Sequence, residues 1–555
     1  MLHTKLVPLA LLALSQAVAA QTTPGSAGQF QQIPPPPVIP KAAPGLRIEH
    51  TNAATTPGAD QLKILVKRLR VSGARIYTEA ELVALSGFRP EVEVSMGDLL
   101  RMAATIADRY HRDGYLLAQA YLPAQDIQNG VISIAVLEGK YGKIIVRNRS
   151  HLSDRIVERQ MAGLASGDVV TRAPLDNRLL LLSDNPGVDV KSTLVPGASV
   201  GSSDLIVDLL PGRRLSGSLE ADNAGNRYTG QYRVGATLNW NEPLGIGDMA
   251  SLRTLTSGKG LNYARASYQL PFGQAKVGVA YSKLNYELIR EFAPLQAHGT
   301  ADIASIYANY PLLRTRDANL YVQVAYDAKS FHDQIDLTGS VGDKRARVLM
   351  TSLYGDSNDS FGGGGSNAAS LTMSNGTLDL ETPSLRALDA LTARSNGRYT
   401  KMAFSASRVQ HVTDALSLAA ALNGQIASTN LDVSEKMELG GMSGVRAYPE
   451  GEAYADQGYV LSLEARLLLA PFTPIQRGQV QALAFVDSGT VERDRHPWAG
   501  AQNRRTLSGA GVGLVWSEAG NFMLRACYAM KLGSEMANSS PDKAGRFWFQ
   551  AVKYF

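Results

Sequence analysis

The side chains that most often carry chemistry in proteins are few in this chain and far apart. The sequence has one cysteine, Cys527, and eight histidines, and no two histidines have the spacing of metal ligands. A lone cysteine also excludes an internal disulfide framework. No Ser/His/Asp arrangement, carboxylate pair or Gly-x-x-x-x-Gly-Lys-Ser/Thr nucleotide loop stands out. We therefore expect no catalytic residue, no metal and no other cofactor, and a barrel hydrolase is the one enzymatic alternative.

Charged residues in segments where apolar and polar residues alternate can form ion pairs instead. Asp487 has the sequence parity of Gln479 and Gln481, opposite to Val480 and Val486, so in a strand it lies on the polar face. A carboxylate on such a face can pair with a cation, and the strength of the pair depends on how dry the site is.

Length and charge narrow the class of protein. The chain has 555 residues, enough for several domains or one unusually large domain. Its 55 basic and 50 acidic side chains give a net charge of +5, which is small for this length. Because no dense Lys/Arg patch is present either, nucleic acid is excluded as a partner.

The N-terminus predicts export. An apolar run, Leu6–Leu14, precedes the small residues Ala17–Ala20, at which a signal peptidase would cut. The run is too short to cross a bilayer, which takes about 20 helical residues; a buried helix is the alternative. We expect residues 1–20 to be a signal peptide. We expect residues 21–59 to be an N-terminal segment and a Pro-rich spacer that joins no packed core. No convincing helical stripe precedes Pro34.

Residues 60–212 contain an internal repeat. The first copy has a strand at 62–66, a helix at 79–85, a helix that starts at Ser95 with Asp98 as its capping-box partner, and strands at 116–122 and 131–137. The second copy has the same order, with a strand at 142–146, helices from Ser153 and Thr171, and strands near 188–195 and 204–210. We expect two β-α-α-β-β modules, at 60–139 and 140–212, each just large enough for a small core.

After residue 212, alternation of apolar and polar residues replaces the helical pattern. Residues 231–240, 459–467 and 522–528 each place apolar side chains on one face and mostly polar ones on the other. Apolar residues toward lipid and polar residues toward a lumen are typical of a transmembrane β-barrel; a soluble β-sandwich is the alternative. We predict sixteen strands over 213–555 and a long periplasmic connection at 355–369. Their predicted starts lie near 214, 231, 247, 260, 274, 302, 318, 345, 369, 396, 414, 458, 478, 505, 520 and 545.

Several local stretches match a known family. Gly114–Ala118, Tyr121–Ile127 and Val136–Gly139 are similar to its first POTRA domain, and Asp222–Asn226 with Thr229-Gly230 to its first barrel hairpin. With the order of segments above, they resemble the outer-membrane transporters of two-partner secretion, the TpsB or ShlB/FhaC/HecB haemolysin secretion/activation proteins. The resemblance covers almost the whole chain beyond the linker. It implies a 16-stranded antiparallel outer-membrane barrel preceded by two periplasmic POTRA domains.

The resemblance also implies where the functional residues lie. In Gly440–Gly451, Val445, Arg446 and Tyr448 match the Val-Arg-Gly-Tyr motif of a family loop that folds back into the barrel. Ala447 stands at the glycine position, and an alanine there would change a loop that needs a left-handed angle. The family motif Phe-x-Asp-x-Gly is present as Phe485, Asp487 and Gly489. We therefore expect a lumenal Arg446–Asp487 latch, with a solvated loop arginine as the alternative.

The last strand, which contains Phe549 and ends at Phe555, suits an edge that closes the barrel. In relatives an N-terminal helix plugs the barrel, and this remains open here.

The implied function is protein export. A large secreted exoprotein, a TpsA-type adhesin or cytolysin, would be captured by the POTRA domains through β-augmentation and would cross the barrel without nucleotide hydrolysis. Outer-membrane lipid and the barrel-assembly machinery are the other expected partners. Two alternatives stay open. One is a barrel-assembly factor of the same superfamily, which commonly has more POTRA modules. The other is a passive porin, for which periplasmic modules have no evident use.

Overall fold

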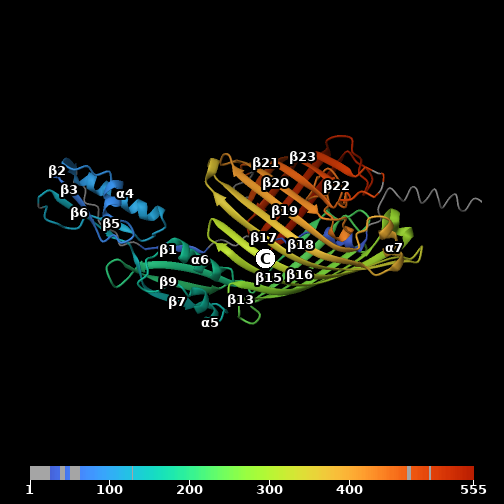
Figure 1. Ribbon diagram of the computed structural model, residues 1–555, viewed down its shortest axis with the longest axis horizontal. Helices are drawn as coiled ribbons and strands as arrows, with labels where there is room; N and C mark the ends of the chain where they lie inside the picture. Colours follow the sequence, from blue (N-terminus) through green and yellow to red (C-terminus); the bar gives the residue numbers. More distant parts are fainter. Residues whose placement is uncertain are drawn as a thin grey trace, which may run out of the picture.

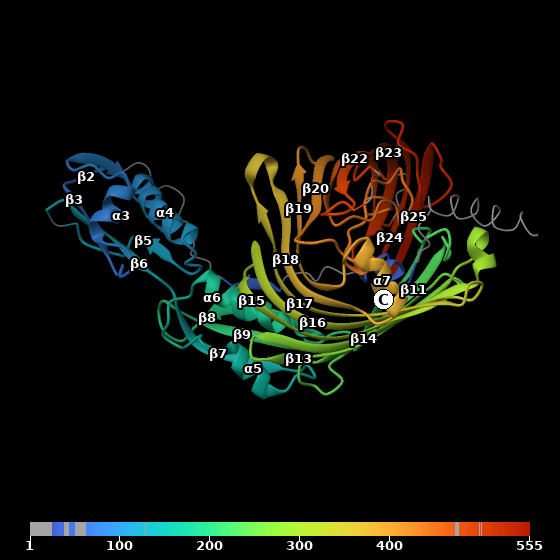
Figure 2. The same ribbon diagram turned by 45° about the vertical axis from the view of Figure 1, so that its right-hand side comes forward.

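Two small α+β modules and a large barrel follow one another along the chain. The computed structural model describes residues 25–37, 44–49, 63–127, 129–471, 477–498, 500 and 502–555. The expected signal peptide, residues 1–20, lies outside this part. Figures 1 and 2 both show the second module between the first module and the barrel. In the described part of the chain, no helix is long and apolar enough to cross a bilayer.

The first module packs two helices against short sheets. Capping boxes start both helices, Thr78 with Glu81 and Ser95 with Asp98, and satisfy amide groups that have no partner within the helix. Ile106 is fully buried in the core. The sheets have the orders β3-β6-β5 and β2-β4. The elements are β2 (Lys63–Val66), β3 (Arg68–Ser72), α3 (Glu79–Leu85), β4 (Val92–Ser95), α4 (Met96–Arg112), β5 (Gln119–Tyr121) and β6 (Val131–Leu137).

The second module contains an unexpected strand from the linker. Its own elements are β7 (Lys140–Asn148), α5 (Asp154–Met161), α6 (Arg172–Ser183), β8 (Val188–Pro196) and β9 (Ser202–Pro211). Linker residues β1 (Gly45–Ile48) pair in parallel with β8, and Leu46 and Ile48 pack against the module core. The prediction that residues 21–59 join no core was therefore wrong here, because alternating Leu46 and Ile48 cover an otherwise unpaired strand edge.

Ion pairs fix the second module to the barrel. Arg314 and Arg316 lie at the turn between two barrel strands. The guanidinium of Arg314 donates to both carboxylate oxygens of Asp184, each at 2.8 Å. Arg316 Nε donates to Oδ1 of Asp176 at 2.6 Å. Both acceptors belong to α6 or the residue after it, so this end of the barrel faces the second module.

Sixteen antiparallel strands close into a barrel in chain order, with the first strand paired to the last. The predicted fold class is confirmed, and the predicted strand starts differ from the observed ones by at most five residues. The strands are β10 (Leu215–Asp222), β11 (Arg233–Asn241), β12 (Met249–Thr256), β13 (Leu261–Phe272), β14 (Ala275–Glu287), β15 (Ala297–Arg314), β16 (Ala318–Ile335), β17 (Ser340–Asp359), β18 (Gly365–Leu380), β19 (Gly397–His411), β20 (Leu416–Ala427), β21 (Gln457–Leu468), β22 (Gln479–Glu492), β23 (Arg504–Glu518), β24 (Phe522–Lys531) and β25 (Gly545–Tyr554).

The two faces of the wall differ as predicted. On β11, Tyr232 next to the strand start and Val234 are 68% and 58% exposed on the outside, whereas Arg233 between them is 5% exposed. The prediction of a long connection at 355–369 was wrong. The register of β17 with β18 continues from Lys344 to Asp359, and only residues 360–364, with η2 (Phe361–Gly363), connect them. Polar, glycine-rich residues there extend the strands beyond the apolar band.

A short helix from the N-terminal segment lies inside the barrel. Residues of α2 (Ser26–Gln31) contact β14, β15, β16 and η3 (Val433–Glu435). The amide of Ser26 donates to Oδ1 of Asp333 at 2.7 Å, and Thr229 Oγ1 donates to Oε1 of Gln29 at 2.5 Å. The helix also packs Ala27 and Phe30 against apolar side chains of the inner wall, among them Tyr263 and Phe292. Its six residues are too few to show an apolar stripe of helical spacing in the sequence. This explains why the sequence before Pro34 did not predict a helix.

We predict that Ile106→Ala destabilises the first module by about 2–5 kcal/mol, because it leaves a cavity under α4. Limited proteolysis of the intact protein should then cleave within residues 63–139 faster than in wild type, with the barrel still folded. The control is Asp108→Ala, which changes an exposed residue of the same helix. Equal cleavage rates for Ile106→Ala and wild type would contradict this assignment of the core.

Candidate functional site

The long loop between β20 and β21, residues 428–456, folds back against the inner wall of the barrel. At its tip, Val445, Ala447 and Tyr448 are fully buried and Arg446 is 3% exposed. The apolar tip residues pack with side chains of the wall, among them Phe485, Leu507 and Trp548. The loop tip is therefore held as a small protein core rather than as a solvated loop.

Arg446 makes several hydrogen bonds with the wall of the barrel. Its Nε donates to Oδ2 of Asp487 at 2.7 Å and its Nη2 donates to Oδ1 at 2.6 Å, so the pair is bidentate. The Arg446 amide also donates to Oδ2 of Asp487, at 3.1 Å. Nη1 donates to Oε1 of Glu464 at 2.6 Å, and Nη2 to Oγ of Ser462 at 2.9 Å. The structure thus brings together the two residues that the sequence singled out.

The other motif residues of β22 shape the space around this ion pair. The Cζ atom of Arg446 lies 3.4 Å from the centroid of the Phe485 ring, a cation–π contact. At Gly489, an added Cβ would lie 2.4 Å from Cδ1 of Leu439. The motif therefore supplies a carboxylate and an aromatic ring that contact Arg446, and a glycine whose missing side chain leaves room for Leu439.

Ala447 does not distort the loop. It has no positive φ, and its Cβ faces Gly509 of β23, where an added Cβ would come within 2.5 Å of it. Alanine therefore fits this position without a left-handed backbone angle, and the bare backbone of Gly509 leaves room for its methyl group.

Tyr448 and Trp548 hold the tip from the side of the last strands. The hydroxyl of Tyr448 donates to the carbonyl of Glu535 at 3.0 Å, and Lys531 Nζ lies 4.9 Å from the centroid of the Tyr448 ring. Trp548 Nε1 donates to the carbonyl of Arg446 at 2.7 Å. Sequence reasoning missed Trp548 and Glu464. The polar face of 459–467 could have drawn attention to Glu464, since it faces the lumen beside Ser462.

The aromatic residues of the C-terminal strand lie where the barrel closes. Residues 218–222 of β10 pair with residues 550–554 of β25. The Phe549 amide donates to Oδ1 of Asn223 at 2.8 Å, and Phe555 and Gly217 exchange two backbone hydrogen bonds of 3.1 Å each. Neither phenyl ring reaches Arg446, so these residues belong to the seam and not to the loop contact.

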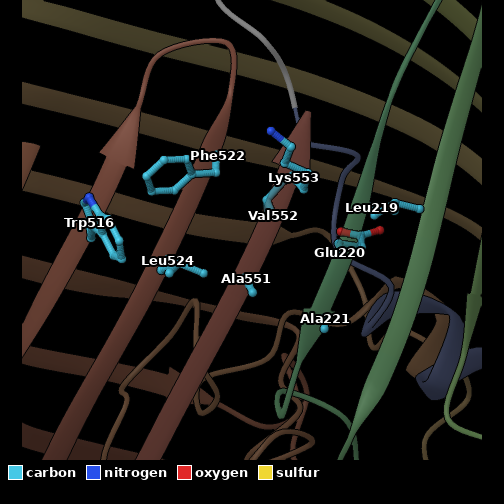
Figure 3. A pocket seen from close by; sticks show the side chains of 9 residues that line it. All are labelled: Leu219, Glu220, Ala221, Trp516, Phe522, Leu524, Ala551, Val552 and Lys553. Atoms are coloured by element: carbon cyan, nitrogen blue, oxygen red, sulfur yellow. The ribbon is translucent and has the colours of Figure 1, made fainter. Parts of the chain in front are cut away.

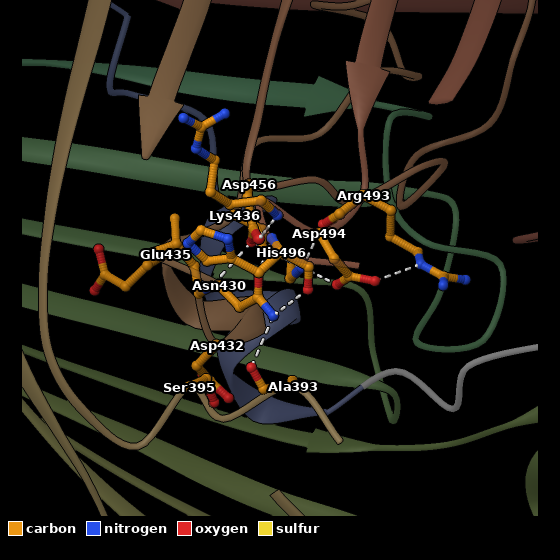
Figure 4. Close-up of polar contacts among 12 residues, drawn as sticks. Ala393, Ser395, Asn430, Asp432, Glu435, Lys436, Asp456, Arg493, Asp494 and His496 are labelled. Carbon is orange, nitrogen blue, oxygen red and sulfur yellow. Dashed lines mark hydrogen bonds and ion pairs between the residues drawn. The ribbon is translucent and has the colours of Figure 1, made fainter. Parts of the chain in front are cut away.

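A second cluster fixes the base of the loop (Figure 4). Lys436 Nζ lies 2.8 Å from Oδ1 of Asp456 and 3.2 Å from Oδ1 of Asp494. Asn430 exchanges two hydrogen bonds with the backbone of His496, at 2.6 and 2.9 Å. Asp494 and His496 belong to the connection between β22 and β23. The loop is consequently anchored at both its base and its tip.

The loop and the N-terminal segment meet inside the lumen. Gln32 Nε2 donates to the hydroxyl of Tyr454 at 2.6 Å, and Arg233 Nη1 donates to the carbonyl of Gln32 at 2.9 Å. Beyond α2, a cavity of about 1110 Å³ lies on the side of the second module and is lined in part by Pro34–Pro37. Two chain segments therefore obstruct a lumen that is otherwise partly open. Within the described ranges, no three His, Cys, Asp or Glu side chains are grouped to hold a metal ion.

Comparisons with known proteins agree with this architecture. The family model described as haemolysin secretion/activation protein ShlB/FhaC/HecB matches residues 201–516, and the model for the ShlB-type POTRA domain matches residues 64–139. The heme/hemopexin transporter protein HuxB of Haemophilus influenzae (strain 86-028NP) is 29% identical over 470 residues, covering 83% of this chain and 82% of HuxB. The outer membrane transporter CdiB of Escherichia coli O6:K15:H31 (strain 536 / UPEC) is 25% identical over 471 residues, covering 83% and 78%.

Solved structures share the fold. CdiB from Escherichia coli superposes with a TM-score of 0.66 at 21% identity, covering 91% of this chain and 93% of that one. CdiB from Acinetobacter baumannii gives a TM-score of 0.59 at 18% identity, covering 99% and 97%.

We predict that Asp487→Ala releases the loop tip, because it leaves the Arg446 guanidinium buried beside one carboxylate instead of two. Losing one partner of a buried pair costs roughly 3–5 kcal/mol. Hydrogen exchange followed by mass spectrometry should show faster exchange at amides of residues 439–448. The control is Glu492→Ala, on the same strand. Unchanged protection of the tip in Asp487→Ala would show that apolar packing alone holds it.

Proposed function

The chain belongs to the haemolysin secretion/activation protein family ShlB/FhaC/HecB, and from this premise we propose how its parts carry a secreted protein across the outer membrane. It is a two-partner secretion transporter of the outer membrane, with POTRA domains in the periplasm and a large secreted partner. We assign residues 60–139 and 140–212 to the two POTRA domains and residues 213–555 to the pore. The sheet orders support this division, except that β1 of the linker adds a strand to the sheet of the second domain.

One observation carries the proposed mechanism: the lumen is obstructed by chain segments and not by the wall. The loop 428–456 is held at its tip by Arg446 and at its base by Lys436. The helix α2 is held in part by polar contacts with Asp333, Thr229 and Tyr454. Such segments can leave without disturbing the barrel strands. We propose that Val445, Arg446 and Tyr448 form a latch with Phe485, Asp487 and Gly489. We also propose that α2 acts as a plug that leaves the lumen during export.

Capture of the partner would use the edges of the periplasmic sheets. The edge of β8 is paired with β1, so β1 and β7 are the outer strands of the sheet of the second module, and β3 and β5 are those of the three-stranded sheet of the first. An extended segment of the partner can add to such an edge by β-augmentation. The proposed partner is an adhesin or a cytolysin of the TpsA type.

Export would be driven by folding of the partner outside the cell, since the sequence has no nucleotide-binding loop. Family members are transporters, and we propose that this chain has no enzymatic activity. The barrel-assembly machinery would insert the barrel into the membrane. The last strand, which contains Phe549 and ends at Phe555, would close it. The assembly-factor and porin alternatives fit less well, because HuxB and CdiB are named as transporters.

We predict that Arg446→Ala lowers secretion of the partner by roughly tenfold or more, because the loop tip loses its bidentate anchor. Arg446→Lys should restore only part of the secretion, since the lysine ammonium cannot make the two parallel hydrogen bonds that the guanidinium makes with Asp487. Secreted partner in the medium is measured by immunoblot, and barrel insertion by heat-dependent mobility in gels. Arg265→Ala, which removes a lumenal arginine bonded to Ser282, is the control. Wild-type secretion by Arg446→Ala would remove the latch from the mechanism.

Loss of the α2 contacts should open the pore. In planar bilayers, deletion of residues 25–33 is expected to raise the single-channel conductance, because the segment no longer fills the lumen. Asp333→Ala, which removes the acceptor of the Ser26 amide, should increase the time spent open. Asp336→Ala changes a nearby carboxylate with no bond to α2 and is the control. Identical conductance for the deletion variant and wild type would show that α2 does not limit the pore.

A further inference from the structure

The outer surface of the barrel is hollowed at the place where it closes. A hollow of about 480 Å³ lies over β10, β23, β24 and β25 (Figure 3). We call it the seam hollow. Its volume falls within the roughly 300–1,000 Å³ of ligand-sized sites. It is lined by Leu219, Glu220, Ala221, Trp516, Phe522, Leu524, Ala551, Val552 and Lys553.

The register of the strands explains the hollow. Ala221 pairs with Ala551, which pairs on its other side with Leu524. The two alanines form a floor of methyl groups at the seam. Leu219, Leu524 and Trp516 are between 40% and 55% exposed around it. The side chains of Glu220 and Val552 point into the barrel, so only their backbone contributes. The side chains that line the hollow are therefore apolar apart from Lys553.

The seam hollow lies at the periplasmic end of the wall. Trp516 and Phe522 flank the turn between β23 and β24, next to the chain end and the start of β10 (Figure 3). Their rings form an edge-to-face pair with centroids 5.1 Å apart, and Trp516 Nε1 donates to the carbonyl of Arg477 at 2.8 Å. Aromatic residues of this kind mark the boundary between lipid tails and headgroups. The floor thus lies at the depth of the tails, and Lys553 at the depth of the headgroups.

We propose that the seam hollow binds one phospholipid of the periplasmic leaflet, with an acyl chain over Ala221 and Ala551 and the phosphate beside Lys553. An apolar hollow inside a bilayer can be filled only by hydrocarbon, since an empty one forfeits its dispersion contacts. A lysine at headgroup depth attracts anionic lipid. Lys553 Nζ donates to Oδ1 of Asn521, which leaves further N–H groups for a phosphate. The inference rests on the outer-membrane location of the family and not on the export mechanism.

The bound lipid would support the part of the wall with the fewest paired residues. β10 and β25 pair over five residues, whereas β24 and β25 pair over nine. An acyl chain that lies across Ala221 and Ala551 contacts both strands of the seam at once. It would therefore add apolar contact where the backbone ladder is short.

The test is native mass spectrometry of the full-length protein in detergent, with phosphatidylglycerol or phosphatidylethanolamine as the added probe. We expect wild type to retain one phospholipid after the others dissociate, with preference for phosphatidylglycerol. Ala551→Phe and Ala221→Phe fill the floor from opposite strands, and each should weaken retention roughly tenfold or more. Ala304→Phe places the same ring at an exposed alanine elsewhere on the wall and should retain the lipid. Lys553→Gln should remove the headgroup preference.

Equal lipid retention by wild type and both floor variants would overturn the proposal. A wild-type protein dimer that disappears in Ala551→Phe would also overturn the proposal, because it would show that a second copy of the chain occupies the seam hollow. Heat-dependent gel mobility establishes that each variant is folded. Lipid retention by a wild-type chain that secretes no partner would support the lipid site. The same result would contradict the proposed function.

Discussion

The demand that every backbone N–H and C=O group inside a bilayer be paired within the protein governs this structure. A sheet can meet that demand only by closing, and closure requires β10 to pair with β25. A closed sheet of sixteen strands encloses a space too wide for the wall's own side chains to fill. The loop 428–456 and α2 occupy that space. The existence of a site inside the barrel is therefore a consequence of how the wall satisfies its backbone.

Holding a cation in that space is costly unless it is fully paired. Arg446 is nearly inaccessible to solvent, and its guanidinium meets two carboxylates, a hydroxyl and an aromatic face. Bare backbone at Gly489 and Gly509 allows the loop to approach closely enough for these contacts. A site built in this way is strong while assembled and loses much of its stability when one partner leaves. That property suits a segment that must be either docked or released.

Sequence patterns predicted the wall well, because alternation over about ten residues is set by lipid outside and water inside. They also placed α3 and α4 closely, and for α4 through the capping residue Ser95. They failed for β1 and α2, whose structure depends on surfaces far away in the chain. β1 exists because β8 has a free edge, and α2 because the lumen offers Asp333 and Thr229. Glu464 and Trp548 were not assigned to the site, since only the docked loop brings Arg446 to them.

The ion pairs from Arg314 and Arg316 to Asp184 and Asp176 determine more than the stability of one contact. They join the tip of a single hairpin, between β15 and β16, to one helix of the second module. The periplasmic module is thereby clamped at one azimuth of the barrel mouth, off the central axis. If the partner is captured by that module, as we propose, it would approach the pore from the side of this hairpin, and its path would be asymmetric about the barrel axis.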